Sequence, residues 1–149
     1  MNRKPQVLFL CTGNSARSQI AEAFLKRYAG DHFDVQSAGL EPIGINPYTL
    51  QVMTELGYDM SGHRSKSARE FMGHTHSRYV ITVCGNADAN CPRGLWSTGE
   101  KLHWPFEDPA AYEGSEEEKL ARFRRIRDEI DQKILTWLKA IEVIPHIHA

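Results

Sequence analysis

Residues 7–19 read VLFLCTGNSARSQ. An apolar run ends in Cys11, five small or polar residues follow, and Arg17 opens a segment with helical periodicity. This order predicts a buried strand, a loop and the N-terminus of a helix. The loop residues carry little bulk, so their backbone N–H groups can converge on one oxyanion. The positive end of the helix dipole adds to that field. The stretch therefore predicts an anion-binding loop.

Cys11 and Arg17 give this loop its chemistry. The planar guanidinium of Arg17 can bind two oxygens of a tetrahedral anion. The same field favours the thiolate form of Cys11, which is the nucleophilic form. Cys11 alone could equally be an inert thiol at the end of a core strand, and a Cys-x5-Arg match alone arises by chance. The strand–loop–helix context favours the functional interpretation. The residues expected to contact the anion are Thr12, Gly13, Asn14, Ser15, Ala16, Arg17 and Ser18.

Bulk properties restrict the class of protein. The 149 residues are the length of one domain, which we expect to span residues 1–149. A net charge of −1 without a long basic run argues against nucleic acid as a partner. No apolar stretch approaches the length of a membrane span. Three cysteines are an odd number and fit reactive thiols in a reducing compartment better than a disulfide framework. We therefore expect a cytoplasmic protein, without a membrane partner, and a monomer.

Hydrophobic periodicity and capping signals predict alternating strands and helices. Strands are expected at 6–10, 34–38, 79–83 and 101–104. Helices are expected at 16–28, from Asn46-Pro47 to Gly57, briefly after Ser67, and from Ser115 until Pro145 ends the last one. Alternating elements of this kind form a parallel α/β sheet of four strands with helices on both faces.

Reactive side chains follow three of these strands. Cys11 ends the first strand, Cys84 follows the third and Asp108 comes just after the fourth. Ligands of parallel sheets bind beyond the carboxyl ends of the strands, so we expect these three groups to meet at one edge. The segment 85–99, which contains Cys91, is polar and rich in turn residues. It is expected to be a long loop, and its part between Cys84 and Cys91 has no large apolar residue to anchor it.

The stretch from Cys11 to Ser18 resembles the phosphate loop of the low-molecular-weight protein tyrosine phosphatases, and Asp108-Pro109 resembles the general-acid motif of that family. The resemblance covers nearly the whole chain. It implies a flavodoxin-like doubly wound fold with the phosphatase-type anion loop after the first strand. It also implies that Cys11 is the nucleophile, that Arg17 binds the oxyanion and that Asp108 is the proton donor.

The chain is more similar still to the thioredoxin-coupled arsenate reductases, which share that fold. Gln19 stands where the phosphatases typically have proline, and segments 83–92 and 103–110 resemble the redox-cysteine and acid segments of the reductases. The resemblance implies that arsenate is reduced to arsenite by a relay of three thiols. Cys11 attacks arsenate, Cys84 attacks Cys11, Cys91 attacks Cys84, and thioredoxin or a similar dithiol protein reduces the final disulfide. The segment between Cys84 and Cys91 should then refold between the two redox states.

Two other functions fit parts of the pattern. A phosphatase that hydrolyses phosphotyrosine through a Cys11 phosphocysteine would use the same loop and acid, with Cys84 as a core residue and Cys91 as an idle surface thiol. A non-catalytic protein that binds an oxyanion or arsenite through three thiols would have no use for Asp108, which could then be an ordinary Asp-Pro turn. Cys84 and Cys91 favour the reductase, although weak phosphatase activity is expected in any case.

No metal or other cofactor is expected. Some relatives bind potassium near the loop, and Asn14, Glu22 and Ser37 match part of that set, but Lys66 replaces the remaining acid. Two His-x-His pairs, at 74/76 and 146/148, have no nearby third ligand for zinc. The arginines of segment 122–127 are expected to form a salt-bridged surface with neighbouring acids.

Overall fold

The computed structural model describes residues 4–73, 76–95 and 99–147. A parallel sheet of four strands lies at its centre: β1 (Gln6–Cys11), β2 (Asp34–Gly39), β3 (Ser77–Thr82) and β4 (Glu100–His103). The strands lie in the order β2-β1-β3-β4, and all three pairings are parallel. Chain order reverses between β1 and β3, and this is the point at which doubly wound sheets bind ligands. The predicted α/β class and doubly wound sheet are confirmed.

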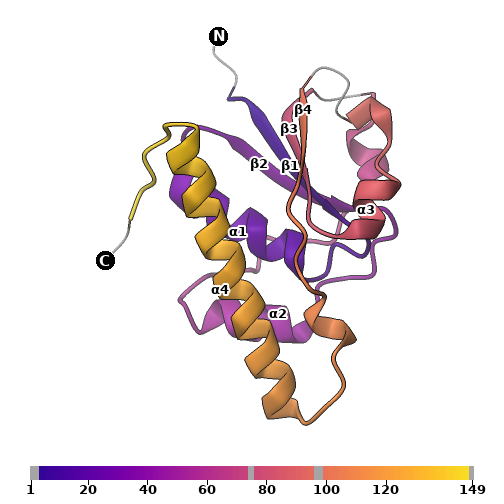
Figure 1. Cartoon of the computed structure of the whole chain (residues 1–149), viewed down its shortest axis with the longest axis vertical. Coiled ribbons are helices and arrows are strands. Elements are labelled where there is room, and N and C mark those ends of the chain that lie inside the picture. Colours follow the sequence, from indigo (N-terminus) through magenta and orange to yellow (C-terminus); the bar gives the residue numbers. More distant parts are fainter. Residues whose placement is uncertain (1–3, 74–75, 96–98, 148–149) are drawn as a thin grey trace.

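Four α-helices surround this sheet: α1 (Arg17–Ala29), α2 (Pro47–Thr54), α3 (Gly85–Ala89) and α4 (Glu116–Ala140). Helices α1 and α4 pack against each other on one side of the sheet, whereas α3 lies on the other side against β1 and β3 (Figure 1). Short 3₁₀ turns occur at Ala68–Phe71, Arg93–Leu95 and Pro109–Ala111. Helices therefore cover both faces, as the alternating pattern predicts.

The helix starts follow the predicted capping signals. The Asn46 side chain accepts a hydrogen bond from the Tyr48 amide, with Pro47 in the first turn. Both Ser67 and Ser115 form complete capping boxes with the glutamate three residues later. The box at Ser67 opens a 3₁₀ turn and not an α-helix.

The predicted end of the last helix at Pro145 is wrong, because α4 ends at Ala140. Glu142 adopts a left-handed conformation with φ of 61°. The amide of Val143 donates to the carbonyl of Leu138, and that of Glu142 donates to Lys139. This is the Schellman arrangement, which closes a helix without a proline.

The expectation of a long loop at 85–99 is also wrong in part. Residues 85–89 form α3, because the Cys84 side chain accepts a hydrogen bond from the Ala87 amide and the Ala87 side chain is fully buried. A small apolar side chain and a sulfur cap anchor this segment where the sequence offers no large hydrophobic residue. Residues 96–98 lie outside the described part of the chain.

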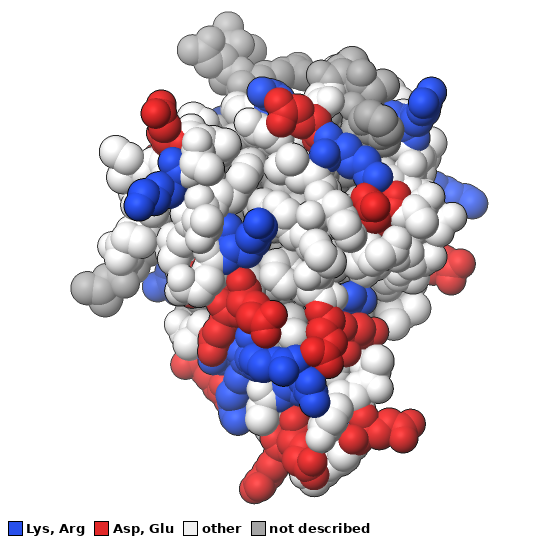
Figure 2. All heavy atoms as spheres, viewed as in Figure 1, with Lys and Arg blue, Asp and Glu red and all other residues white. Residues whose placement is uncertain are grey.

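The charged surface of α4 is the salt-bridged surface that the sequence predicts. Figure 2 shows Lys and Arg gathered between Asp and Glu over the region of this helix. Arg122 and Arg125 contact Glu107, Arg124 and Arg127 contact Glu55, and further pairs join Arg127 to Asp128 and Arg125 to Glu129. Asp131 instead accepts a hydrogen bond from the Tyr28 hydroxyl. Among the described residues, no helix combines the length and the apolar character needed to cross a membrane.

Candidate active site

A pocket of about 230 Å³ opens at the carboxyl end of β1. It is lined by the loop that runs from Cys11 to Arg17, by Glu41 and Ile43 after β2, and by Asp108 and Ala110 after β4. Three segments that are far apart in the sequence thus form one pocket. The structure brings Cys11, Arg17 and Asp108 together in this pocket, whereas Cys84, the third group expected at this edge, contacts the loop at Thr12 and does not line the pocket.

The Cys11 sulfur lies inside the anion loop, and only 3% of the residue is exposed. Its Sγ atom is 2.9 Å from the Ser18 hydroxyl and 3.2 Å from the Asn14 amide nitrogen. Asn14 Nδ2 donates to Ser18 Oγ, so the Ser18 hydrogen is free to point toward the sulfur. Two hydrogen-bond donors are thus directed at one sulfur.

The N-terminus of α1 faces the same pocket. Its N-cap residue is Ala16, which has no polar side chain to satisfy the first amides of the helix. Such a helix end is suited to an anion. The Arg17 guanidinium donates to the Phe106 carbonyl at 3.0 Å and lies 3.8 Å from the Asp108 carboxylate. Arg17 is therefore held at the mouth of the pocket by the segment that carries Asp108.

The loop backbone contains one left-handed residue and packs closely against the end of β2. Asn14 has a left-handed φ of 50°. A Cβ atom on Gly39 would lie 2.6 Å from the Thr12 carbonyl oxygen, closer than atoms can approach. Glycine at the end of β2 therefore permits the loop to lie directly against that strand.

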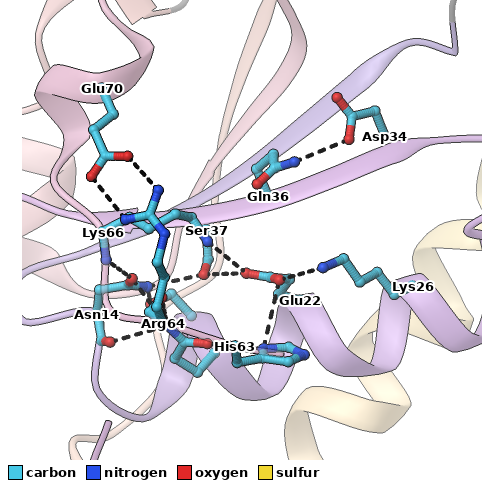
Figure 3. A network of polar contacts seen from close by, with 12 residues as sticks. Asn14, Glu22, Lys26, Asp34, Gln36, Ser37, His63, Arg64, Lys66 and Glu70 are labelled. Carbon is cyan, nitrogen blue, oxygen red and sulfur yellow. Dashed lines mark hydrogen bonds and ion pairs between the residues drawn. The ribbon is translucent and has the colours of Figure 1, made fainter. Parts of the chain in front are cut away.

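A buried polar network supports the loop from behind (Figure 3). Asn14 Nδ2 donates to Ser37 Oγ at 3.0 Å, and Ser37 Oγ donates to Glu22 Oε1 at 2.5 Å. Lys26 donates to the other oxygen of Glu22, and the Lys66 ammonium lies 3.5 Å from its first oxygen. Burial by itself would raise the pKa of Glu22, but these hydrogen bonds and the Lys66 charge bring that pKa below its usual value. These contacts thus favour the charged form of a buried carboxylate behind Cys11.

Gln19 and His63 extend this network. Gln19 Nε2 donates to Asn14 and to the Arg64 carbonyl, which leaves its Oε1 to accept from His63 Nδ1 at 3.0 Å. His63 Nδ1 also lies 3.6 Å from Glu22 Oε2. Burial lowers the pKa of His63, and this outweighs the opposing effect of the Glu22 charge. Burial therefore favours the neutral form of the histidine.

Sequence reasoning grouped Glu22 with Lys66 near the loop through the resemblance, but it missed that Gln19 and His63 join them in one network. One signal could have indicated it. Glu22 stands inside the apolar segment IAEAF, on the side of α1 that packs against the sheet, and it is 1% exposed. An acid in such a position requires partners in the fold. Lys66 supplies a positive charge where the resemblance would otherwise suggest a cation site.

Cys84 lies on the other side of the loop, 5% exposed and at the N-terminus of α3. Its sulfur is 3.4 Å from Thr12 Oγ1 and accepts from the Ala87 amide at 3.3 Å. Asn86 Nδ2 donates to the same Thr12 hydroxyl at 2.8 Å, so the Thr12 hydrogen can point at Cys84. Thr12 thus connects the anion loop to a second thiol.

Cys91 is not brought to the pocket. It follows the C-terminal end of α3 and is half-buried, and its sulfur lies 3.9 Å from the Pro92 carbonyl oxygen. Burial raises the pKa of this thiol, and the Asp88 carboxylate adds to the increase while the Lys101 ammonium opposes it. All three cysteines are free thiols.

The structure describes only part of the two His-x-His pairs. His74 and His148 lie outside the described residues, and His146 pairs with Asp31. Within ranges 4–73, 76–95 and 99–147 there is no cluster of three or more His, Cys, Asp or Glu side chains arranged to hold a metal ion.

The chain matches one protein family and is similar to named bacterial relatives. The family model described as low molecular weight phosphotyrosine protein phosphatase matches residues 6–143. The arsenate reductase of Halalkalibacterium halodurans is 47% identical over 137 residues, which are 92% of this chain and 96% of that protein. The arsenate reductase of Bacillus subtilis is 43% identical over 128 residues, or 86% of this chain and 91% of the relative.

Solved structures of arsenate reductases are also similar to this chain. A structure described as an arsenate reductase in the phosphate binding state has a TM-score of 0.74 and 30% identity, and the match covers 92% of this chain and 98% of that one. A thioredoxin-dependent arsenate reductase of Corynebacterium glutamicum has a TM-score of 0.70 and 34% identity, over 95% of this chain and 63% of that one.

Proposed function

Because the chain belongs to the low molecular weight phosphotyrosine protein phosphatase family, we propose that it is the kind of member that reduces arsenate to arsenite, in arsenic detoxification, with thioredoxin as the reductant. Relatives at 43–47% identity are named arsenate reductases, and one structural relative is named as thioredoxin-dependent. The observation that supports the proposal most is the 3.4 Å contact between Thr12 Oγ1 and Cys84 Sγ. It puts a second thiol beside the loop that holds the first one, and a phosphatase has no need of that thiol.

The first step is an attack of the Cys11 thiolate on the arsenic of arsenate. The loop amides and Arg17 bind the equatorial oxygens, whose shape and charge resemble those of phosphate. Asp108, at the mouth of the pocket, protonates the departing oxygen, which leaves as water. A positioned general acid of this kind contributes about 10²- to 10⁴-fold to the rate. The product is a sulfur–arsenic bond on Cys11.

The second step transfers two electrons to arsenic. The Cys84 thiolate attacks the Cys11 sulfur, a Cys11–Cys84 disulfide forms and the sulfur–arsenic bond breaks. The electron pair of that bond stays on arsenic, so As(V) becomes As(III) and arsenite leaves. Thr12 and the Ala87 amide both contact the Cys84 sulfur and hold it beside the loop.

The third step moves the disulfide outward. The Cys91 thiolate attacks Cys84, a Cys84–Cys91 disulfide forms and Cys11 leaves as a thiolate. The thiol pair of thioredoxin then reduces this disulfide. A thiol relay requires a reducing environment, so we also propose that the protein acts in the cytoplasm. We propose in addition that it acts as a monomer.

The deciding experiment is arsenate-dependent oxidation of NADPH in the presence of thioredoxin and its reductase. Cys84→Ser and Cys91→Ser should each lose turnover by at least about a thousandfold, because the relay fails without either sulfur. Hydrolysis of an aryl phosphate uses only the loop and the acid, so it should survive in both variants. Cys11→Ser is the matched control, since it should abolish both reactions.

Normal arsenate turnover by both Cys84→Ser and Cys91→Ser would refute the relay. Loss of aryl phosphate hydrolysis in the same variants would indicate that the substitutions damage the loop itself. Fast aryl phosphate hydrolysis without arsenate turnover by the parent protein would favour the phosphatase. Tight arsenate or arsenite binding with neither activity would favour a binding protein.

A further inference from the structure

Helix α3 separates the two cysteines that would form the outer disulfide. Cys84 is its N-cap and Cys91 follows its C-cap, Asn90. An α-helix rises about 1.5 Å per residue, so the seven steps from Cys84 to Cys91 span roughly 10 Å. A disulfide requires the two Cα atoms to lie within roughly 7 Å of each other. Helix α3 must therefore open before Cys84 and Cys91 can bond, and whatever holds α3 closed opposes that disulfide.

One side chain of α3 carries most of the polar contacts to the sheet. Asp88 Oδ1 lies 2.7 Å from the Lys101 ammonium of β4 and accepts from the Thr82 hydroxyl of β3 at 3.2 Å. Lys101 Nζ also donates to the backbone carbonyl of Asp88 at 3.0 Å. Lys101 thus binds both the side chain and a carbonyl near the helix C-terminus, where carbonyl groups have no partner within the helix.

The Thr82 hydroxyl of β3 contacts Asp88, His103 and the Leu102 carbonyl. Thr82 is fully buried, and its hydroxyl lies 2.8 Å from His103 Nδ1. With His103 Nδ1–H donating to Thr82 Oγ1, the single hydroxyl hydrogen is shared between Asp88 Oδ1 at 3.2 Å and the Leu102 carbonyl oxygen at 3.3 Å, so Lys101 is the stronger partner of Asp88. Two strands therefore hold one carboxylate of α3 through directed contacts. No charged side chain of α3 other than Asp88 is available for this, because the helix reads GNADA.

We propose that Asp88 and Lys101 form a latch that keeps α3 closed in the reduced protein and thereby sets the reduction potential of the Cys84–Cys91 pair. Both are positioning residues, since they act through the helix and not on the substrate. The proposal rests on the proposed function, because that function requires this disulfide. Lys101 also lies close enough to Cys91 to act on its charge, which links the latch to the attacking thiol.

The test measures the Cys84–Cys91 equilibrium in a Cys11→Ser background, so that no other intramolecular disulfide can form. The protein is equilibrated with mixtures of reduced and oxidised dithiothreitol, and free thiols are counted after acid quenching. Two protein thiols give up two electrons and two protons, and the cyclic disulfide of dithiothreitol takes them up. Asp88→Asn and Lys101→Gln should each shift the equilibrium about tenfold toward the disulfide, which is a potential about 30 mV lower. The double variant should shift it little further, because both substitutions open the same contact.

Glu100→Gln is the matched control. Glu100 pairs with Arg78 between the same two strands, at 3.6 Å, without touching α3. Its removal should leave the potential unchanged. A direct charge effect on the Cys91 thiolate would instead move the two latch variants in opposite directions, since removing Asp88 stabilises the thiolate and removing Lys101 destabilises it. Opposite shifts would therefore overturn the latch.

Hydrogen exchange tests the latch without any disulfide. In the reduced protein, the amides of Asp88 and Asn90 donate within α3, and their exchange should be about tenfold faster in Asp88→Asn than in the parent. Unchanged exchange, or unchanged potentials in both variants while the parent forms the disulfide, would overturn the latch and leave the relay standing. Failure of the parent to form the disulfide in any buffer would overturn the relay and the latch together.

Discussion

The anion loop and helix α3 both hold a cysteine at the carboxyl edge of the sheet, but they are held in different ways. Behind the loop, Asn14, Ser37 and Glu22 are buried and joined to one another by hydrogen bonds. Helix α3 is anchored by the buried Ala87 and by the pair of Asp88 and Lys101, whose side chains are 35% and 25% exposed. Water can replace the second kind of contact but not the first.

This difference suits the two tasks that the proposed relay gives to the site. In that relay Cys11 meets a tetrahedral anion in one fixed geometry, so a fully paired and buried support is useful. Cys84 exchanges between two partners in the same proposal, so its segment should be able to open at low cost. In the structure, the buried contacts lie on the Cys11 side and the more exposed contacts hold the helix between Cys84 and Cys91.

The largest expected effect comes from removing the central amide of the loop network. Asn14→Ala should lower the free energy of unfolding by about 3 kcal/mol, because several buried donors and acceptors lose their partner at once. Asn14 contacts Ser18, Ser37, Gln19 and the Lys66 amide. Urea denaturation followed by circular dichroism measures the change.

The matched substitution on the other region is Asn86→Ala in α3. Asn86 makes exposed contacts to Thr12 and to Asn90, so its removal should cost less than about 1 kcal/mol. Equal losses for Asn14→Ala and Asn86→Ala would mean that the two regions are held equally firmly, contrary to the comparison drawn above.

A smaller effect should appear in the dependence of stability on pH. The pKa of His63 is lowered in the folded protein, so the unfolded chain takes up its proton first and stability falls as the pH drops below about 6.5. The pKa of Glu22 is also lowered, so its contribution is present above about 4.5 and is lost as the pH falls through the folded value. Stability should therefore decline in two stages on acidification.

His63→Gln separates these stages. Glutamine cannot take up a proton, so the decline that begins near pH 6.5 should become shallower while the one below about pH 4.5 remains. Urea midpoints measured between pH 4 and 8 test this. An unaltered profile between pH 5 and 7 would show that His63 does not titrate differently in the folded and unfolded states.

The smallest predicted effect strengthens the weaker region. Gly85 is the first residue of α3, and a Cβ atom added there would meet no neighbouring atom within 4 Å. Gly85→Ala should stabilise the protein by about 0.5 kcal/mol, since alanine loses less conformational entropy in a helix. It should also slow hydrogen exchange within α3. Faster exchange would show that the backbone at this position needs glycine.

The fold follows from local patterns in this chain because the decisive residues are neighbours in sequence. An apolar run followed by CTGNSAR predicts strand, loop and helix, and capping boxes at Ser67 and Ser115 act within four residues. The prediction failed at Pro145 and at segment 85–99. The helix end depends on a left-handed Glu142, and α3 depends on contacts from β3 and β4, neither of which a local pattern reveals.

By itself the sequence determined the α/β class, the alternation of strands and helices that implies one ligand edge, and the residue types expected there, since periodicity and turn chemistry are local. Only the tertiary structure decided which side chains meet. Glu22 lies with Ser37, Lys66 and His63, Thr12 with Cys84, and Asp88 with Lys101, because the crossovers of the sheet bring distant segments together. Where these side chains are buried, their contacts are hydrogen bonds and ion pairs in a low-dielectric interior. No spacing of residues along the chain predicts such contacts.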